Sequence, residues 1–195
     1  MDPLNILFGI ALIISMGANF SATKSSLKQQ VTKFVTKPKS YLQKVPLNVS
    51  AFLVILELLG VFGVGVFKTA DTESWMIVRM VFLLMYIIFS WLQIYSFKSL
   101  GKNYSPEIVI LYGHELVEKG PYKIIRHPQY LFQFLSDLSA GITLLSYPVL
   151  LLVIIFEIPL FILRARKEEK MLKKHFGNTF TEYKKKSSFI IPLLS

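Results

Sequence analysis

The sequence contains no cysteine in 195 residues. Disulfide bonds, thiolate metal ligands and cysteine nucleophiles are therefore excluded. The HExxH, GxSxG and Walker patterns are also missing, and the three histidines are too scattered to indicate a metal site. We expect no bound metal. If the chain is an enzyme, its reaction should need neither a metal nor an activated hydroxyl.

Acidic residues are scarce, with 12 Asp and Glu against 22 Lys and Arg, and the formal net charge is +10. Such a charge suggests a nucleic-acid partner until the positions of the basic residues are considered. Segment 21–45 carries six lysines and no acid, whereas loop 68–74 has one lysine and two acids. Basic loops of membrane proteins stay in the cytoplasm. The membrane therefore explains the charge better, and we expect no nucleic-acid partner.

Long apolar runs dominate the composition, which is 53% hydrophobic and 14% aromatic with a mean hydropathy of +0.50. A helix needs roughly 20 residues to cross a hydrocarbon core of about 30 Å. The first run lacks a basic n-region and a cleavage site, so we interpret it as a membrane span rather than a signal peptide. Five spans are predicted: Pro3–Phe20, Pro46–Phe67, Trp75–Phe97, His127–Leu145 and Pro148–Leu163.

These spans predict an all-α integral membrane protein with about five transmembrane helices. The last two are individually a little short, and only Ser146-Tyr147-Pro148 joins them, which favours a tight C-terminal helical hairpin. Residues 1–97 would hold three membrane helices and the basic cytoplasmic loop 21–45. Residues 98–195 would form a catalytic region with two further membrane helices and a cytoplasmic C-terminal segment.

The charge of the loops also predicts the orientation of the chain. The basic loop, the loop between spans three and four and the tail all fall on the cytoplasmic side, with the N-terminus outside. We therefore expect a multi-pass membrane protein whose polar chemistry faces the cytoplasm. Its membrane would be the cell membrane in a prokaryote or the endoplasmic reticulum membrane in a eukaryote.

Four ionisable residues fall within the predicted spans, where such groups are rare and are functional candidates by default. For Arg79 we favour a side chain that snorkels from the outer end of its span. Glu57 and Asp137 are interpreted as partners in structural hydrogen bonds between helices. Glu157 lies beside Pro159, which must open the helix about one turn earlier. That opening could surround a ligand or merely suit helix packing.

A denser group of polar residues precedes span four. Gly120-Pro121 indicates a turn, and Arg126-His-Pro-Gln-Tyr130 follows at the mouth of the span. Proline is tolerated in the first helical turn, and the free N–H groups there attract an anionic group. The alternative is a simple juxtamembrane anchor, because Arg, His and Tyr favour the membrane interface. Composition alone does not decide between an anchor and a site.

A second group follows span five, where Arg164 and Glu168 are four residues apart and share a helix face. An ordinary ion pair on a solvated helix would explain them. However, Arg164 directly follows an apolar span, where a partly desolvated guanidinium can hold a carboxylate with two hydrogen bonds. Further on, Phe176-Gly177 predicts the end of the helix, and a basic segment at the membrane surface follows.

Taken together, GPY-x4-RHPxY, a hydrophobic hairpin, RxRxxEE, FGxxFxEY and a closing proline resemble the isoprenylcysteine carboxyl methyltransferases. The resemblance extends to the wider membrane methyltransferase family, which includes phospholipid methyltransferases, and it covers about Gly113–Pro192. It implies a cytoplasmic pocket for S-adenosyl-L-methionine, with S-adenosylhomocysteine as the product. The implied cofactor-binding residues are His114, Glu115, Leu116, Val117, Tyr122, His127, Pro128, Gln129, Tyr130 and Glu168.

In the same resemblance, Arg164 is the catalytic and substrate-binding residue that faces the carboxylate of the acceptor. A shift of the alignment would put Arg166 or Glu169 in place of Arg164 or Glu168. The implied substrate is a prenylated cysteine protein, or a similar lipid, that enters from the bilayer. A carboxylate with a pKa of about 3.5 is already ionised at neutral pH and needs no general base.

Three other functions remain as alternatives. A phospholipid N-methyltransferase would share the fold, but its ammonium substrate would need a proton acceptor. Membrane sterol reductases have a similar C-terminal layout but bind NADPH, and we expect them to need more spans and more arginines. A small transporter or membrane scaffold would place its polar groups at mid-bilayer depth.

Overall fold

The computed structural model describes residues 2–28, 34–67 and 74–191, and these residues are mostly helical. Three short 3₁₀ turns and one two-stranded ribbon lie between the helices. The helices are α1 (Pro3–Lys28), α2 (Val45–Val61), α3 (Met76–Leu100), α4 (Pro128–Thr143), α5 (Tyr147–Leu152), the π segment η4 (Val153–Glu157), α6 (Ile158–Phe176) and α7 (Asn178–Lys186). The helical fold class predicted from the sequence is confirmed.

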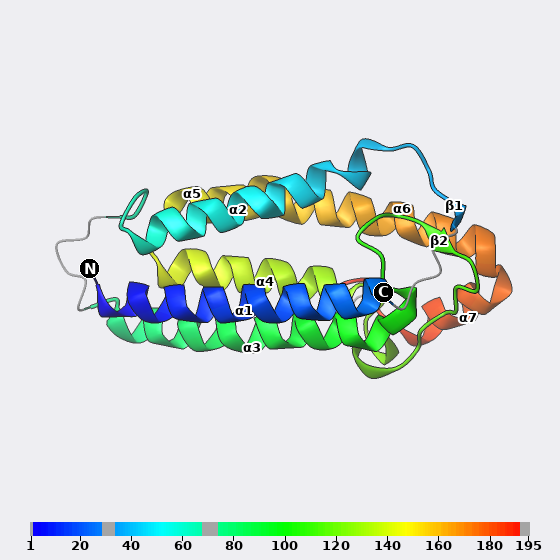
Figure 1. The fold of residues 1–195 in the computed structure, drawn as a ribbon, viewed down its shortest axis with the longest axis horizontal. Helices are drawn as coiled ribbons and strands as arrows, with labels where there is room; N and C mark the ends of the chain where they lie inside the picture. Colours follow the sequence, from blue (N-terminus) through cyan, green and yellow to red (C-terminus); the bar gives the residue numbers. More distant parts are fainter. Residues whose placement is uncertain (1, 29–33, 68–73, 192–195) are drawn as a thin grey trace.

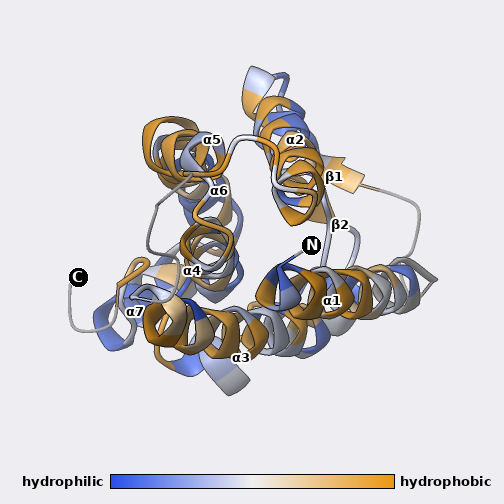
Figure 2. Cartoon of the chain, turned by 90° about the vertical axis from the view of Figure 1, so that its left-hand side faces the viewer, coloured by the Kyte–Doolittle hydropathy of each residue, from blue (hydrophilic) through white to orange (hydrophobic). Residues whose placement is uncertain are grey.

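The long helices form an elongated bundle (Figure 1). Helices α1, α3 and α4 lie side by side, and α2 lies beside the continuous α5–η4–α6 helix. Large apolar side chains are exposed on the helices, among them Ile13, Ile77 and Leu84. Figure 2, in which the ribbon is coloured by hydropathy, shows that hydrophobic residues make up much of these helices. A soluble protein does not expose apolar area on this scale. The fold is that of a membrane protein.

Four helices are long and apolar enough to cross a membrane. By length and composition, the described residues offer Pro3–Lys24, Tyr41–Val61, Met76–Asn103 and Tyr147–Phe176. Helix α4, at the predicted fourth span, has 16 residues and a length of about 24 Å, which is less than the roughly 30 Å of a hydrocarbon core. The structure therefore supports four of the five predicted spans on this criterion.

The predicted hairpin is present between α4 and α5. The backbone N–H of Ser146 donates to the carbonyl of Gly141 at 2.8 Å, which closes the connection. A Cβ atom at Gly141 would lie 2.7 Å from the side chain of Leu150, so glycine lets the two helices approach each other. The apolar fifth span and the charged segment after it form one helix without a break from Tyr147 to Phe176, over 30 residues, as the predicted helix end at Phe176-Gly177 requires.

The proline in this long helix has the local effect that its chemistry predicts. Pro159 cannot donate a backbone hydrogen bond, and the turn just before it, Val153–Glu157, is a π-helix. The helix ends at Phe176, and Gly177 follows with a φ of 55°, as predicted for the end of the helix. The basic segment after it is the short helix α7.

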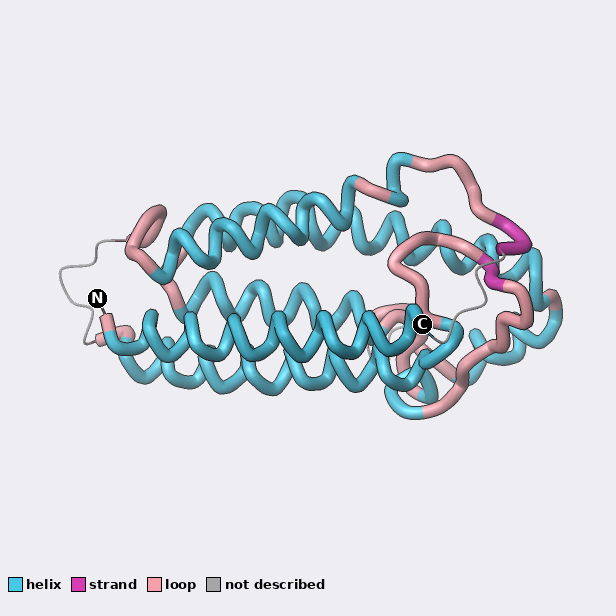
Figure 3. The backbone as a smooth tube through the Cα atoms, in the orientation of Figure 1, coloured by secondary structure: helices cyan, strands magenta, loops and turns pink. Residues whose placement is uncertain are grey.

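The long polar segments gather at one end of the bundle, where Figure 3 shows most of the loops. Strand β1 (Phe34–Thr36) pairs antiparallel with β2 (Ile110–Leu111), a ribbon that the sequence did not indicate. This ribbon joins the basic segment to the loop before α4. The two segments therefore lie at the same end of the bundle, which agrees with their predicted location on one side of the membrane. The expectations for loop residues 68–73, for Lys33 and for Pro192 lie outside the described residues.

The prediction that Arg79 snorkels toward solvent is wrong. Its side chain is 4% exposed and donates to the Thr143 carbonyl at 2.8 Å, to Asp2 at 2.6 Å and to Asn5 at 2.7 Å. These partners come from the start of α1 and the end of α4, so they satisfy the guanidinium inside the protein. Arg79 therefore joins three helices at the end of the bundle opposite the polar segments.

Candidate functional site

A polar cavity of about 110 Å³ lies at the polar end of the bundle. Its walls come from the end of α3 and the loop that follows, from the 3₁₀ turn Gly120–Lys123, from the start of α4 and from α6. The residues that line it are Leu100, Asn103, Ser105, Glu107, Ile108, Val109, His114, Tyr122, Arg126, His127, Gln129, Glu168, Met171 and Leu172. We call it the interfacial cavity.

Four buried polar atoms on the walls of the interfacial cavity have no hydrogen-bond partner among the described residues. They are His114 Nδ1, Tyr122 Oη, His127 Nε2 and Gln129 Oε1. The nearest carboxylate oxygen to His127 Nε2 belongs to Glu169 at 3.6 Å, which is too long for a hydrogen bond. Buried polar groups without partners destabilise a protein, so their convergence on one cavity indicates a polar ligand.

The ring of His114 is positioned to accept a hydrogen bond. Burial, reinforced by the nearby His175, lowers its pKa to about 4. His114 is therefore neutral at physiological pH, and one ring nitrogen has a free lone pair. The adjacent Glu115 is exposed and forms an ion pair with Lys102 at 2.6 Å, and the hydrogen bond from Lys102 lowers the pKa of Glu115.

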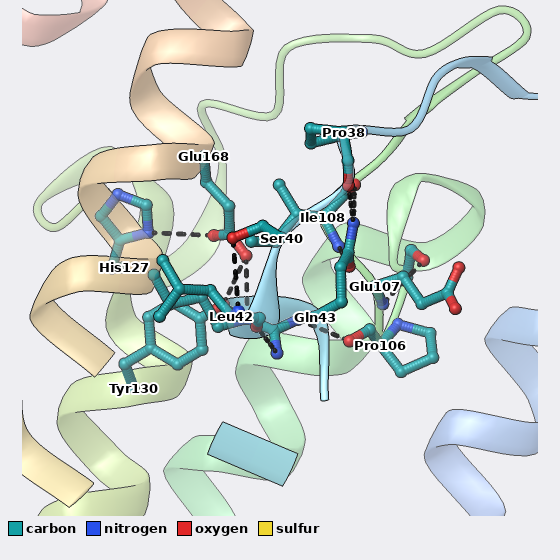
Figure 4. A network of polar contacts seen from close by, with 12 residues as sticks. Pro38, Ser40, Leu42, Gln43, Pro106, Glu107, Ile108, His127, Tyr130 and Glu168 are labelled. Carbon is teal, nitrogen blue, oxygen red and sulfur yellow. Dashed lines mark hydrogen bonds and ion pairs between the residues drawn. The ribbon is translucent and has the colours of Figure 1, made fainter. Parts of the chain in front are cut away.

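A hydrogen-bonded group of three residues lies beside the interfacial cavity. The Tyr130 hydroxyl donates to Glu168 at 2.5 Å, while Arg164 Nε donates to Tyr130 at 2.8 Å and to Glu168 at 3.2 Å. The predicted pairing of Arg164 with Glu168 is therefore present. Figure 4 shows Glu168 between Tyr130 and His127, whose Nδ1 lies 3.6 Å from the carboxylate. The phenol and the carboxylate fix the guanidinium.

The Arg164 side chain is only 3% exposed. Its terminal nitrogens donate to the carbonyls of Pro106 at 2.5 Å and Leu42 at 3.4 Å. A guanidinium has five N–H groups, so one on each terminal nitrogen has no partner among the described residues. Arg164 also lines a second cavity of about 90 Å³, the arginine cavity, together with Tyr130 and Gln133.

Of the alternative residues, Glu169 and Arg166 line neither polar cavity. Glu169 is buried and accepts hydrogen bonds from Arg126 at 2.6 Å and Lys184 at 2.8 Å, which ties α6 to α7 and to the segment before α4. Arg166 is exposed beside an apolar groove. The geometry therefore favours Arg164 and Glu168 over their neighbours.

Not all of the predicted cofactor residues converge. His114, Tyr122, His127, Gln129 and Glu168 line the interfacial cavity, and Tyr130 lines the arginine cavity beside it. Four other predicted residues line neither cavity: the three that follow His114 and the proline at the start of α4. These are Glu115, Leu116, Val117 and Pro128.

Sequence reasoning missed Gln43. Its amide donates to the carbonyls of Ile108 at 2.9 Å and Pro38 at 3.0 Å and accepts from the Ile108 N–H at 2.7 Å (Figure 4). Gln43 thereby fixes the loop that supplies Ile108 to the interfacial cavity. No motif could reveal it, because its partners are backbone groups, one of them 65 residues away in sequence.

An apolar groove of about 310 Å³ runs along the hairpin and shares Tyr130 with the arginine cavity. Apart from Tyr130 and Arg166, its walls are aliphatic and phenyl side chains, which suits a hydrocarbon chain. The lining residues are Tyr130, Phe134, Ile158, Phe161, Ile162, Arg166, Phe189, Ile190 and Ile191.

The fold and these cavities define a class of membrane protein in which a polar pocket, a buried arginine and an apolar groove meet at one end of a helical bundle. The sequence model of the isoprenylcysteine carboxyl methyltransferase (ICMT) family matches residues 80–174. The structure is similar to that of the eukaryotic intramembrane Ras methyltransferase ICMT (isoprenylcysteine carboxyl methyltransferase). That match has a TM-score of 0.66 and 17% identity, and it covers 100% of this chain and 69% of the other.

A curated relative, the uncharacterized protein YpbQ of Bacillus subtilis (strain 168), is 33% identical over 101 residues. This match covers 52% of the present chain and 58% of the relative, which is less than two thirds of its length. The match to this family model agrees with the resemblance that the motifs carry, and the solved structure shows that the fold is shared.

Proposed function

We propose that this chain transfers a methyl group from S-adenosyl-L-methionine to the carboxylate of a prenylated cysteine or a similar lipidated acid. One observation carries the proposal. Four predicted donor-binding residues that line the interfacial cavity each have a buried polar atom without a partner among the described residues, and the cavity adjoins a buried arginine. The family and the fold agree with a membrane methyltransferase. The proposed site faces the cytoplasm, from which a water-soluble donor would enter.

The interfacial cavity has the chemistry for the donor but not its full size. Its volume of about 110 Å³ is below the roughly 300–1,000 Å³ typical of small-molecule pockets. The walls of the cavity would therefore have to widen when the donor binds. Bound donor would supply the electrophilic methyl group, while Glu168 and the four unpaired atoms would hold its polar groups.

Arg164 would bind and orient the acceptor. Its two free N–H groups can hold both oxygens of a carboxylate, and Tyr130 and Glu168 restrict the guanidinium to one orientation. The acceptor is already an anion, so its attack needs no general base. Burial of Arg164 keeps water from the carboxylate, which strengthens the electrostatic contact and removes hydration from the nucleophile.

The apolar groove would hold the lipid chain of the substrate. Tyr130 belongs to both the groove and the arginine cavity, so an acid bound at Arg164 could place its chain along Phe134 and Phe161. The exposed apolar faces of the bundle would let such a lipid arrive from the bilayer. The apolar groove and a buried arginine favour a lipidated acid over the amine headgroup of a phospholipid.

The test uses the full chain purified in detergent. Binding of S-adenosyl-L-methionine is measured by calorimetry, and methyl transfer is measured with farnesylcysteine and with phosphatidylethanolamine. We expect donor binding and transfer to the acid. Absence of donor binding at any workable concentration would refute a methyltransferase and leave a scaffold or transporter, and transfer to the amine lipid alone would establish the N-methyltransferase instead.

Arg164→Ala is expected to reduce transfer at least about 100-fold while donor affinity changes less than about threefold. The magnitude reflects the loss of a bidentate charged contact, worth about 3 kcal/mol. Lys170→Ala is the matched control, because it removes an exposed cation from the same helix and lines neither polar cavity nor the apolar groove. Similar losses in both variants would show that Arg164 has no special contact with the acceptor.

A further inference from the structure

A third cavity, of about 320 Å³, lies deeper in the bundle among α1, α2, α3 and α4. We call it the intramembrane cavity. Although it lies between apolar helices, more than half of its lining residues are polar. They are Leu12, Ser15, Met16, Asn19, Ser50, Ala51, Val54, Glu57, Tyr86, Ser90, Gln93, Phe97, Gln133, Ser136 and Asp137.

Two acids, Glu57 and Asp137, line the intramembrane cavity, and a third lies behind them. Glu157 accepts from Gln133 at 3.4 Å, and its Oε2 has no hydrogen-bond partner in the described part of the chain. No Lys or Arg is among the lining residues that the structure describes. Glu57 is 2% exposed, and its Oε1 has no hydrogen-bond partner within the described ranges. The interhelical hydrogen bond expected for Glu57 is therefore missing at this atom.

Acids buried in this way take up a proton, accept from a donor or pair with an opposite charge, because an isolated buried carboxylate is very unfavourable. Glu57 lies on α2 and Asp137 on α4, and one oxygen of Glu57 and one of Glu157 lack a partner among the described residues. The surrounding side chains of Ser15, Ser90 and Gln93 offer further hydrogen-bonding groups. The complementary ligand is a cation that donates several hydrogen bonds.

A bare metal ion does not fit this arrangement. No group of three His, Asp or Glu residues within the described part of the chain is placed to hold one. The volume also exceeds the roughly 30 Å³ of a single water by about tenfold, so the cavity can accept an organic group. An alkylammonium group provides one positive charge and three N–H donors, as a lysine side chain does.

The position of the cavity indicates that the ligand is an amphiphile. Met16 on α1 and Ala51 on α2 belong to its walls and are exposed, which is consistent with an opening of the cavity between these two helices. We propose that the intramembrane cavity binds the protonated amine of a single-chain lipid, whose hydrocarbon chain extends into the bilayer.

The intramembrane cavity adjoins the arginine cavity, with which it shares Ser50, Phe97 and Gln133. Along α4, Tyr130 and Asp137 are seven residues apart, which corresponds to about 10 Å. The bound amine would therefore lie two turns from the arginine that we assign to the acceptor. Binding there does not depend on the proposed methyl transfer and is measured without the methyl donor.

The experiment uses the full chain in a neutral detergent at pH 7.4, with dodecylamine as the probe. Dodecanol has the same chain without the charge, and dodecyltrimethylammonium has the charge without N–H donors. We expect dodecylamine to raise the melting temperature in a saturable manner and to bind at least about tenfold more tightly than the other two. Equal binding of dodecanol, or no saturable binding of dodecylamine, would refute the proposal.

Glu57→Gln is expected to weaken dodecylamine binding at least about tenfold, since it removes the charge with little change in shape. Asp137→Asn provides a second, independent variant, and Glu182→Gln on the exposed face of α7 is the control for nonspecific charge. Unchanged affinity in either folded cavity variant would contradict the assignment. Displacement of the amine by sodium chloride but not by choline chloride would show that the cavity prefers a small metal cation.

Discussion

The adjacent acids Glu168 and Glu169 allow a sharp test of the structure. Substitution by glutamine should mainly lower the melting temperature at Glu169 and mainly lower donor affinity at Glu168. Glu169 forms a buried ion pair with Arg126, whose Nε lies 2.6 Å from Oε1, and the two side chains are 10% and 5% exposed. Arg126 also donates to the carbonyls of Lys184 and Ser187. The pair therefore joins α6 to both the segment before α4 and the end of α7.

Glu169→Gln removes one charge of this pair and leaves Arg126 buried. Breaking a buried ion pair costs about 3–5 kcal/mol, but the glutamine oxygen can still accept one hydrogen bond. We therefore expect a loss of about 2–3 kcal/mol. The pair between Glu169 and Lys184 adds little, because Lys184 is 42% exposed. For a chain of this size, 1 kcal/mol shifts the melting temperature by about 2–4 °C, so the expected decrease is about 4–12 °C.

Glu168→Gln is the matched comparison. The amide oxygen can still accept from Tyr130, but the charge opposite the buried Arg164 is lost, so we expect a smaller decrease in melting temperature than for Glu169→Gln, about 2–6 °C. The negative charge on the wall of the interfacial cavity is lost, and donor affinity should fall about tenfold or more. Tryptophan fluorescence during heating and calorimetry with S-adenosyl-L-methionine measure the two effects. If Glu169→Gln removes donor binding without lowering the melting temperature, the assignment of the two acids is reversed.

Three further predictions concern stability. Arg79→Met should destabilise the fold by about 3–5 kcal/mol with unchanged donor affinity, because Asp2 Oδ2 and Asn5 Oδ1 lose their donor far from the site. An unchanged melting temperature would contradict the buried geometry. Gln43→Leu should lower the free energy of unfolding by about 2–4 kcal/mol and speed amide hydrogen exchange at Ile108, because the Ile108 N–H loses its acceptor. Unchanged exchange at Ile108 would count against this contact. The pKa of His114 is about 4 in the folded state and about 6.5 in the unfolded state, so on acidification the unfolded state binds the proton first. The free energy of unfolding should therefore decrease between pH 6.5 and pH 4. Thermal melts of His114→Gln should show a weaker pH dependence over this range.

Much of the fold was predictable because the membrane imposes simple length and charge rules. Apolar runs located the helices, Gly177 marked the end of α6, and Pro159 marked the irregular turn before it. Some helix ends differed from the predicted span ends. The first span was predicted to end at Phe20, but α1 continues to Lys28. The β1–β2 ribbon was not predictable, since two or three residues carry too weak a pattern.

The candidate site was predicted in part. The spacing of Arg164 and Glu168 on one helix face anticipated their contact, and the motif before α4 supplied Tyr122, His127, Gln129 and Tyr130 to neighbouring cavities. Contacts between distant segments were beyond the sequence, because no local pattern records them. The partners of Arg79 are the clearest case: an arginine near a helix end usually reaches water, and only the packed bundle shows the alternative.

The π segment Val153–Glu157 has a consequence for comparing this chain with its relatives. A π turn contains one more residue than an α turn, and each residue rotates a helix by about 100°. Arg164 and Glu168 follow this segment, so the extra residue sets which way both of them point. An alignment that gains or loses one position there keeps every letter of the motif and still turns it away from the cavity. Homologous sequences and chimeric proteins should therefore be compared by counting residues through this turn, not by matching the motif alone.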